Sequence, residues 1–325
     1  MIIAGIDEAG LGPVLGPMVV SATAFAADVP EAADLWELLR GAVVRKKSRR
    51  QGSAIVVGDS KKLFDRSRSD GLVPLERAVL AMLVNLPQFH GEMPSTLAAL
   101  MEGVSAVPAS VADEYPWYNT RQFGLPFQDN SISVKLAGNA LKLAFRNSGV
   151  YFLGARVEPM FVKQYNRYIA ATNNKSTTAF DCTCRAIMWL WQSFVGQDMD
   201  VMVDRQGGRM HYREPLQRIF CDASLKVLNE DEKLSSYDIE QDGRQMKVSF
   251  AVGGEELCLA TALSSMMSKY IRELFMEQLN AFWAGKLDGL ESTAGYYVDG
   301  KRFYEQIKPL LDELGINEEM LLRSR

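Results

Sequence analysis

Residues 1–20 read MIIAGIDEAGLGPVLGPMVV. Met1 to Ile6 is a short apolar run, which is typical of a buried strand. Two carboxylates, Asp7 and Glu8, follow this run directly. A turn is then indicated by five residues that favour turns: Gly10, Gly12, Pro13, Gly16 and Pro17. Residues 18–25 are again apolar and partly β-branched, which predicts a second strand.

The two acids at the end of the first strand have two explanations. Successive strand residues point to opposite faces of a sheet, so Asp7 and Glu8 cannot both face one core. Hard divalent cations prefer oxygen ligands, and paired acids at a strand end suit such a cation. A solvated turn that carries two charges explains the same residues, and the local pattern alone does not decide between them.

Two further acidic positions follow later in the chain. MDVMVD, residues 199–204, predicts another apolar strand that ends in a carboxylate, Asp204. Glu255 and Glu256 begin a predicted helix over residues 255–283. Acids in the first turn of a helix also stabilise the helix dipole, so this pair has a purely structural explanation as well.

The remaining pattern alternates strands with helices, which indicates an α/β fold. Further strands are expected over 54–57, 150–157, 225–228, 235–240 and 246–252, and helices over 31–40, 70–85, 176–194, 211–220 and 301–313. Residues 86–149 contain five prolines and are predicted to be mostly irregular or to form short helices. We expect one domain over residues 1–325 that contains this segment.

Composition excludes some classes of protein. The chain has 325 residues with 36 basic and 40 acidic side chains, so it is not a generally basic nucleic-acid coat. A local basic groove stays open, and RKKSRR at 45–50 is a candidate or simply a solvated loop. The four cysteines lack zinc-finger spacing, and a reducing cytoplasm is expected. No apolar run approaches a membrane span and no signal peptide is indicated, so no membrane association is expected.

Taken in order, these segments resemble ribonuclease HII, the type 2 ribonucleases H. Residues 5–20 are similar to the family's opening strand and glycine turn, and GDSKKL at 58–63 is similar to its next motif. Thr172-Asn173-Asn174 and Val203-Asp204 match the segments around the third acid. Glu255 stands where the family has its fourth acid, which is usually Asp. ALSSMMSKYIR at 262–272 and Gly295-Tyr296 match the late motifs.

The resemblance implies a ribonuclease H-like fold, with a central mixed sheet flanked by helices and an inserted segment. It implies an endonuclease that hydrolyses the RNA strand, or embedded ribonucleotides, of RNA–DNA hybrid duplexes and leaves 5′-phosphate and 3′-hydroxyl ends. Two divalent ions, Mg²⁺ or Mn²⁺, would be held by the catalytic acids Asp7, Glu8, Asp204 and Glu255. The substrate-binding residues implied are Gly10, Leu11, Gly12, Asp59, Ser60, Lys61, Lys269 and Tyr296. Neither histidine of the chain, His90 or His211, lies in a matched motif, so a metal-activated water rather than a histidine base is expected.

The chain departs from the family in three respects. Leu11 replaces an arginine between two glycines, which removes a potential phosphate contact. The interval between Asp59 and Asp204 is long, so residues 86–149 are interpreted as an insertion of unknown role, with a smaller one near 229–245. Glu256 beside Glu255 leaves the fourth acid open by one position.

Two other functions are compatible with parts of the pattern. The turn from Gly10 to Gly16 could hold phosphates in a nucleotide-binding enzyme, although the G-x-x-x-x-G-K-[ST] motif is absent from the sequence and the turn follows two acids. A catalytically lapsed homologue that binds nucleic acid or a protein partner is the other alternative. The presence of acids at all four catalytic positions of the family argues against a loss of activity.

Overall fold

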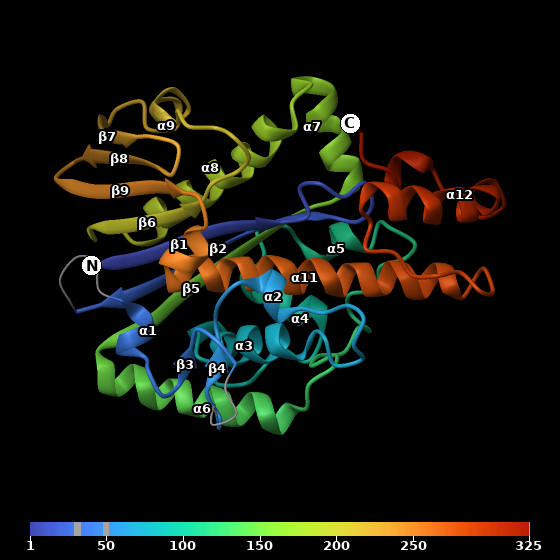
Figure 1. Ribbon diagram of the computed structural model, residues 1–325, viewed down its shortest axis with the longest axis horizontal. Helices are drawn as coiled ribbons and strands as arrows, with labels where there is room; N and C mark the ends of the chain where they lie inside the picture. The colour runs from blue at the N-terminus through green and yellow to red at the C-terminus, as the bar shows by residue number, and fades with distance from the viewer. Residues whose placement is uncertain (29–33, 48–51, 325) are drawn as a thin grey trace.

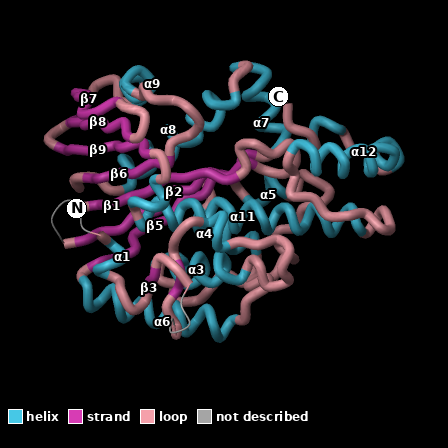
Figure 2. The backbone as a smooth tube through the Cα atoms, viewed as in Figure 1, coloured by secondary structure: helices cyan, strands magenta, loops and turns pink. Residues whose placement is uncertain are grey.

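A seven-stranded mixed sheet forms the centre of the computed structural model, which describes residues 1–28, 34–47 and 52–324 (Figures 1 and 2). The strand order is β5-β2-β1-β6-β9-β8-β7. Helices cover both faces of this sheet, which confirms the predicted α/β class and the central mixed sheet flanked by helices.

The central strand β1 is parallel to β6 on one side and antiparallel to β2 on the other. β9 is parallel to β6, whereas β5, β8 and β7 run antiparallel to their neighbours. The strands are β1 (Ile2–Ala9), β2 (Met18–Ala27), β5 (Val150–Met160), β6 (Met199–Asp204), β7 (Ser224–Glu230), β8 (Leu234–Gln241) and β9 (Arg244–Ala251). A separate parallel pair is formed by β3 (Val43–Val44) and β4 (Ile55–Val56).

Two hydrophobic clusters, one on each face, hold the helices to the sheet. Residues of β1 alternate between them, with Ile2 and Ile6 in one cluster and Ile3 in the other, because successive strand side chains point to opposite faces. The cluster that contains Ile2 includes α7 (Val162–Thr172), α8 (Lys175–Ser193) and α9 (Arg213–Ile219). The cluster that contains Ile3 includes α1 (Leu35–Leu38), α3 (Val73–Leu83), α4 (Leu97–Val104), α5 (Ala109–Ala112), α6 (Ser131–Ser148), α11 (Leu259–Ala284) and α12 (Tyr297–Glu313).

Helix α11 packs directly on the backbone of β1. A Cβ atom on Gly5 would lie 2.0 Å from the backbone nitrogen of Thr261, so only glycine allows this approach. Hydroxyls on α11 then bond to the strands: Ser264 donates to the Gly5 carbonyl at 2.9 Å, and Ser268 donates to the Asp7 carbonyl at 3.1 Å. The register of α11 on the sheet is therefore fixed by hydrogen bonds as well as by apolar packing.

The single helix predicted over 255–283 is wrong in one respect. Cys258 has φ −132° and ψ 125°, an extended conformation that divides the segment into a short helix α10 (Gly254–Leu257) and the long helix α11. The sequence has no proline or glycine at this break, so periodicity could not locate it. As a result, Glu255 lies on a separate helical turn, and its side chain can reach back to Ser265 of α11.

The segment 86–149 is more ordered than its prolines predicted. It contains the 18-residue helix α6, which the sequence prediction of irregular or short-helical structure missed, besides α4, α5 and a 3₁₀ turn at Pro87–Phe89. Aromatic side chains of this segment pack on helices outside it: the ring of Tyr118 lies 4.9 Å from that of Phe275 and the ring of Trp117 lies 6.3 Å from that of Trp283. The segment therefore belongs to the hydrophobic core.

A buried carboxylate ties the same segment to the helices beneath it. Glu76 on α3 accepts backbone hydrogen bonds from Phe127, Gln128 and Asp129 at 2.5, 2.7 and 2.6 Å. Its other contact is the hydroxyl of Tyr270 on α11, at 2.8 Å. This one side chain satisfies three backbone N–H groups that would otherwise be buried without partners.

The other predicted strands and helices are found with small shifts of their ends. Residues 31–33 of the helix predicted over 31–40, and residues 48–50 of the basic run, lie outside the described residues. Residues 229–245, expected to be a smaller insertion, form the end of β7, the turn to β8, β8 itself and the start of β9. Short elements complete the chain: α2 (Ser60–Leu63) and a 3₁₀ turn at Glu318–Met320. None of the helices within residues 1–28, 34–47 and 52–324 has the length and apolar character needed to cross a bilayer.

The close approach at Gly5 predicts a large effect of a single methyl group. Gly5→Ala should lower the free energy of unfolding by about 3 kcal/mol or more, because backbone atoms of α11 cannot move aside. Denaturant unfolding followed by circular dichroism measures this change. Gly124→Ala is the matched control, since no atom lies within 4 Å of the added methyl there. Equal stability of the two variants would contradict the packing described.

Candidate active site

Three of the four acids predicted from the sequence lie at the carboxyl ends of two adjacent parallel strands. Ile6 of β1 is paired with Val203 of β6, so the next residues, Asp7 and Asp204, come at the same edge of the sheet. Glu8 follows in β1. The Asp204 carboxylate accepts a hydrogen bond from the backbone N–H of Gly254 at 2.8 Å. Since Gly254 begins α10, this bond also brings Glu255 to the edge.

Asp7 and Glu8 point to opposite faces of the sheet, as strand geometry predicts. Asp7 is 5% exposed and its carboxylate accepts the backbone N–H of Glu8 at 2.6 Å. The Glu8 carboxylate accepts a hydrogen bond from Gln206 at 2.9 Å, and Gln206 also donates to Thr183 of α8 at 3.0 Å. Glu8 is therefore held from the α8 side of the sheet.

Of the two adjacent glutamates on α10, Glu255 contacts the buried part of the site. Its carboxylate accepts a hydrogen bond from the Ser265 hydroxyl at 2.8 Å, and Ser265 lies 3.0 Å from the hydroxyl of Ser60. Glu256 has a side chain that is 67% exposed, and it pairs with Lys62 at 3.6 Å. This geometry favours Glu255 as the fourth acid.

The acids interact electrostatically, and their pKa values show it. Burial, followed by the charges of Glu8 and Asp204, raises the pKa of Asp7 well above its usual value. Burial raises the pKa of Glu8 to about 7, with a further contribution from Asp204. Burial and then the charge of Glu255 raise the pKa of Asp204. Such mutual repulsion is relieved by a bound cation.

One lysine predicted from the sequence faces this cluster. Burial acts to lower the pKa of Lys61, but the charges of Glu255, Asp7 and Asp204 raise it overall. Asp59, the residue before α2, accepts the backbone N–H of Lys61 at 3.0 Å and so caps the helix that carries the lysine. Asp59 thus orients Lys61 and pairs with Lys62 at 2.8 Å.

The donor chemistry of the acids fits a divalent cation, but their present arrangement is not that of a formed site. Four carboxylates supply the oxygen ligands that Mg²⁺ and Mn²⁺ prefer. Within the part of the chain that the structure describes, no group of three or more His, Cys, Asp or Glu side chains is placed to hold a metal ion. Each carboxylate instead accepts a hydrogen bond from a donor group of the protein. In addition, the side chains of Asp7 and Glu8 point to opposite faces of the sheet. Sharing an ion requires these side chains to rotate.

The glycine turn lies against the late Gly-Tyr motif. The carbonyl of Gly295 accepts the backbone N–H groups of Val14 and Leu15 at 2.7 and 3.2 Å. Tyr296 follows at once and is 53% exposed. The structure therefore brings two segments of the sequence motifs together, although 280 residues separate Leu15 from Gly295.

Within the turn, the three residues predicted to bind substrate have different environments. Gly10 has φ +83°, a conformation that favours glycine, whereas a methyl group added at Gly12 would have no atom within 4 Å. The Leu11 side chain is half-buried against the cluster that contains Ile2, and not beneath the segment 86–149. Leu11 therefore has an apolar packing role in place of a phosphate contact.

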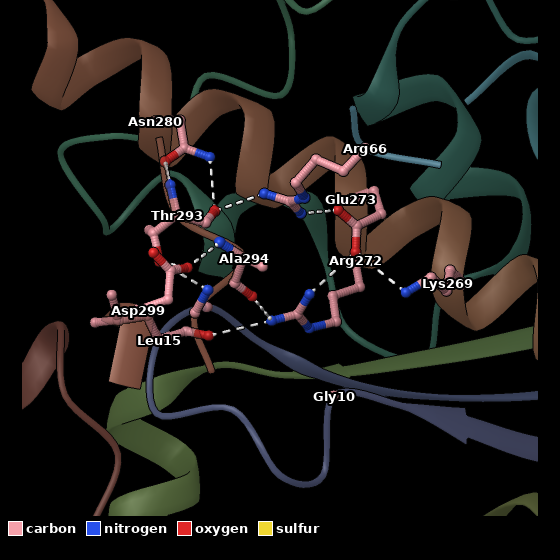
Figure 3. A network of polar contacts seen from close by, with 12 residues as sticks. Gly10, Leu15, Arg66, Lys269, Arg272, Glu273, Asn280, Thr293, Ala294 and Asp299 are labelled. Carbon is pink, nitrogen blue, oxygen red and sulfur yellow. Dashed lines mark hydrogen bonds and ion pairs between the residues drawn. The ribbon is translucent and has the colours of Figure 1, made fainter. Parts of the chain in front are cut away.

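Two buried arginines support the turn from behind. Arg272 of α11 donates to the carbonyls of Leu15 and Ala294 at 3.4 and 3.0 Å (Figure 3). Arg323, near the end of the chain, donates to the carbonyls of Gly10, Pro13 and Gly16. Burial and then the nearby charge of Arg272 lower the pKa of Arg323 to about 9.

Lys269 is not brought to the acids. Its ammonium lies 3.6 Å from Glu273 and 4.9 Å from the ring centre of Phe64. Glu273 also pairs with Arg66 and Arg272, so one carboxylate serves three cations (Figure 3). In this arrangement Lys269 belongs to the network behind the glycine turn.

Several residues that shape the site were missed in the sequence. Gln206 and Arg323 have no motif of their own, and each acts through a contact distant in sequence. Arg323 is 313 residues from Gly10, so only the fold could reveal that contact. Ser265 and Ser268 lay within a matched motif, but their partners were not predictable from it.

Comparisons with known proteins find likeness in structure only. No family model and no curated protein matches the chain. The ribonuclease HII of Archaeoglobus fulgidus, solved in complex with PCNA, is 15% identical with a TM-score of 0.43, over 100% of this chain and 95% of that one. The ribonuclease H2 of Pyrococcus horikoshii OT3 is 14% identical with a TM-score of 0.46, over 99% and 92%.

Bst-RNase HIII, solved in complex with Mn²⁺, is 14% identical with a TM-score of 0.43. That match covers 99% of this chain and 66% of the other. All three structures carry ribonuclease H names of the kind that the sequence motifs suggested.

The raised pKa of Glu8 predicts a pH-dependent stability. Between about 4.5 and about 7, the folded protein holds this proton more tightly than the unfolded chain, so stability falls as pH rises through that range. In EDTA, Glu8→Gln should reduce this fall by on the order of 1–3 kcal/mol. Denaturant unfolding at pH 5 and pH 8 (roughly bracketing the titration) measures the difference. Glu256→Gln should leave the pH profile unchanged, and identical profiles for all three proteins would contradict the acid cluster.

The buried guanidinium of Arg323 predicts a second loss of stability. Arg323→Ala should cost about 2–4 kcal/mol, because the turn carbonyls lose a shared donor inside the protein. Urea unfolding monitors the change. Arg218→Ala is the control: its side chain is 75% exposed, and its pair with Glu214 should contribute less than about 1 kcal/mol. Similar small losses in both variants would show that the turn does not depend on Arg323.

Proposed function

We propose that this protein is a metal-dependent endonuclease that hydrolyses the RNA strand, or embedded ribonucleotides, of RNA–DNA hybrid duplexes. The observation that carries the proposal is that Asp7, Glu8, Asp204 and Glu255 lie at one edge of the sheet, where burial and then the charges of neighbouring acids raise the pKa values of the first three. A site that cleaves phosphodiesters with two divalent ions requires clustered carboxylate ligands. Such a cluster is destabilising when no cation is bound.

The acids would hold Mg²⁺ or Mn²⁺, which lower the pKa of a water molecule and offset charge on the reacting phosphoryl group. Asp7 and Asp204, on adjacent strands, would hold the ions together with Glu8 and Glu255. Lys61 faces the same acids and is suited to contact a substrate phosphate. Ser60 supports this arrangement through Ser265, which holds Glu255.

The glycine turn is suited to recognise ribose. Gly10, Leu11 and Gly12 supply backbone N–H groups, and the loop that follows them is held by hydrogen bonds to Gly295. Tyr296 lies beside this loop and is exposed. The 2′-hydroxyl can accept and donate hydrogen bonds, so main-chain groups can distinguish RNA from DNA at one nucleotide. The buried arginines keep the turn in place, and the tyrosine ring can pack on the sugar.

The experiment is hydrolysis of a duplex with one embedded ribonucleotide and of an RNA–DNA hybrid, with Mg²⁺ or Mn²⁺ and with EDTA. Asp7→Asn and Asp204→Asn should each lose about 100-fold or more in rate, because each removes a ligand whose ion stabilises the transition state by several kcal/mol. An all-DNA duplex should stay intact.

The adjacent glutamates supply a matched control. Glu255→Gln should reduce the rate severely, whereas Glu256→Gln, an identical chemical change on an exposed neighbour, should have a small effect. Near wild-type cleavage by Asp7→Asn or Asp204→Asn would refute the site. Binding of hybrid without cleavage under any divalent ion would instead favour a catalytically lapsed homologue.

A further inference from the structure

A cavity of about 540 Å³ lies next to the acid cluster. Glu255 forms part of its wall, so the cavity and the candidate active site share a side chain. The other side is formed by residues before and within the basic run: Trp36, Arg45, Lys46 and Lys47. Part of the lining belongs to the GDSKKL motif at 58–63, but neither that motif nor the proposed catalytic residues account for the lysine side of the cavity.

The cations that line the cavity differ in how far they are neutralised. Lys62 pairs with Asp59 at 2.8 Å and with Glu256 at 3.6 Å. Arg45 pairs with Asp34 at 2.6 Å and donates to the carbonyl of Glu256 at 3.0 Å.

The remaining two cations, Lys46 and Lys47, are exposed. Neither side chain forms an ion pair or hydrogen bond with another residue in the ranges 1–28, 34–47 and 52–324. Lys47 is near enough to Asp70 for its charge to act on that carboxyl, but neither lysine is held in an ion pair among the described residues.

The wall that carries these lysines is well anchored. The Trp36 indole N–H donates to the carbonyl of Val57 at 2.9 Å, and the Arg45 guanidinium stacks 3.8 Å above the Trp36 ring. The strand pair β3–β4 fixes the backbone just before Arg45. The base of the lysine segment is thus held at a set place beside the acids.

We propose that this cavity binds the sugar–phosphate backbone of the nucleic-acid substrate beside the cleaved bond, with Lys46 and Lys47 contacting its phosphates. The inference rests on the proposed function, since it takes the acid cluster as the cleavage site. The charge layout favours a polyanion over a small anion. The lining carries three acids, Asp59, Glu255 and Glu256, which would repel a single phosphate held among them. A continuous backbone can instead place successive phosphates along the lysine side of the cavity.

The test measures duplex binding by Lys46→Ala/Lys47→Ala in the Asp7→Asn background, so that the substrate stays intact. Binding of an RNA–DNA hybrid is titrated at several salt concentrations. Loss of two phosphate contacts should reduce the slope of log K against log salt by about 1.8, with a several-fold loss of affinity at low salt. Because both lysines are exposed, the thermal melting curve should be unchanged.

The matched control is Lys286→Ala/Lys308→Ala, which removes the same charge. Both lysines are exposed; Lys286 lies beyond the far end of α11 and Lys308 lies on α12 (Figure 1). A 26-residue helix spans roughly 39 Å, so Lys286 is remote from the cavity. This variant should keep the parent's salt slope.

The outcomes separate the two proposals. If Asp7→Asn still cleaves, or the protein neither binds nor cuts hybrid, the proposed function fails. If the hybrid is bound and cut by the wild type but Lys46→Ala/Lys47→Ala keeps the parent's slope, the cavity inference fails alone. An equal change in slope for the two double variants would show that the effect comes from net charge alone. That result would also overturn the cavity inference. Saturable binding of a mononucleotide that depends on these lysines, without a change for duplex, would overturn it in favour of a small-ligand site.

Discussion

Helix α11 lies on β1 with no side chain between the two backbones at Gly5, and several contacts that position the site come from this helix. The same helix carries Ser264, Ser265 and Ser268, whose hydroxyls bond to β1 and to Glu255. It also carries Arg272, which supports the glycine turn. One close helix–strand contact therefore sets the acids and the turn relative to each other.

Buried charges of both signs, each unfavourable for folding, lie in neighbouring parts of the site. On one side, acids are crowded at a sheet edge with raised pKa values; on the other, Arg272 and Arg323 are buried behind the turn with lowered pKa values. Both arrangements oppose folding, since desolvated charges are expensive. Their presence is consistent with a site that holds cations at one place and presents main-chain donors at another.

Much of the architecture could be predicted from the sequence because it depends on local pattern. The apolar runs at 1–6 and 199–204 predicted β1 and β6. In the structure these strands pair in parallel, so the acids at their ends lie at one edge of the sheet. The break at Cys258 could not be predicted, because no proline or glycine marks it. Helix α6 does carry local signals, an N-cap at Asn130 and a left-handed Gly149 at its end, and the prediction missed it because the prolines before it extended the expected irregular segment. The supporting roles of Gln206 and Arg323 could not be predicted, because their partners are distant in sequence.

The most direct test of the central claim is a crystal of the protein soaked in Mn²⁺, with anomalous scattering used to locate the ions. The account predicts peaks at the edge of the sheet between Asp7 and Asp204, with Glu8 or Glu255 rotated away from Gln206 or Ser265 to complete the coordination. The absence of a peak at this edge at millimolar Mn²⁺, or strong peaks only elsewhere on the protein, would contradict it.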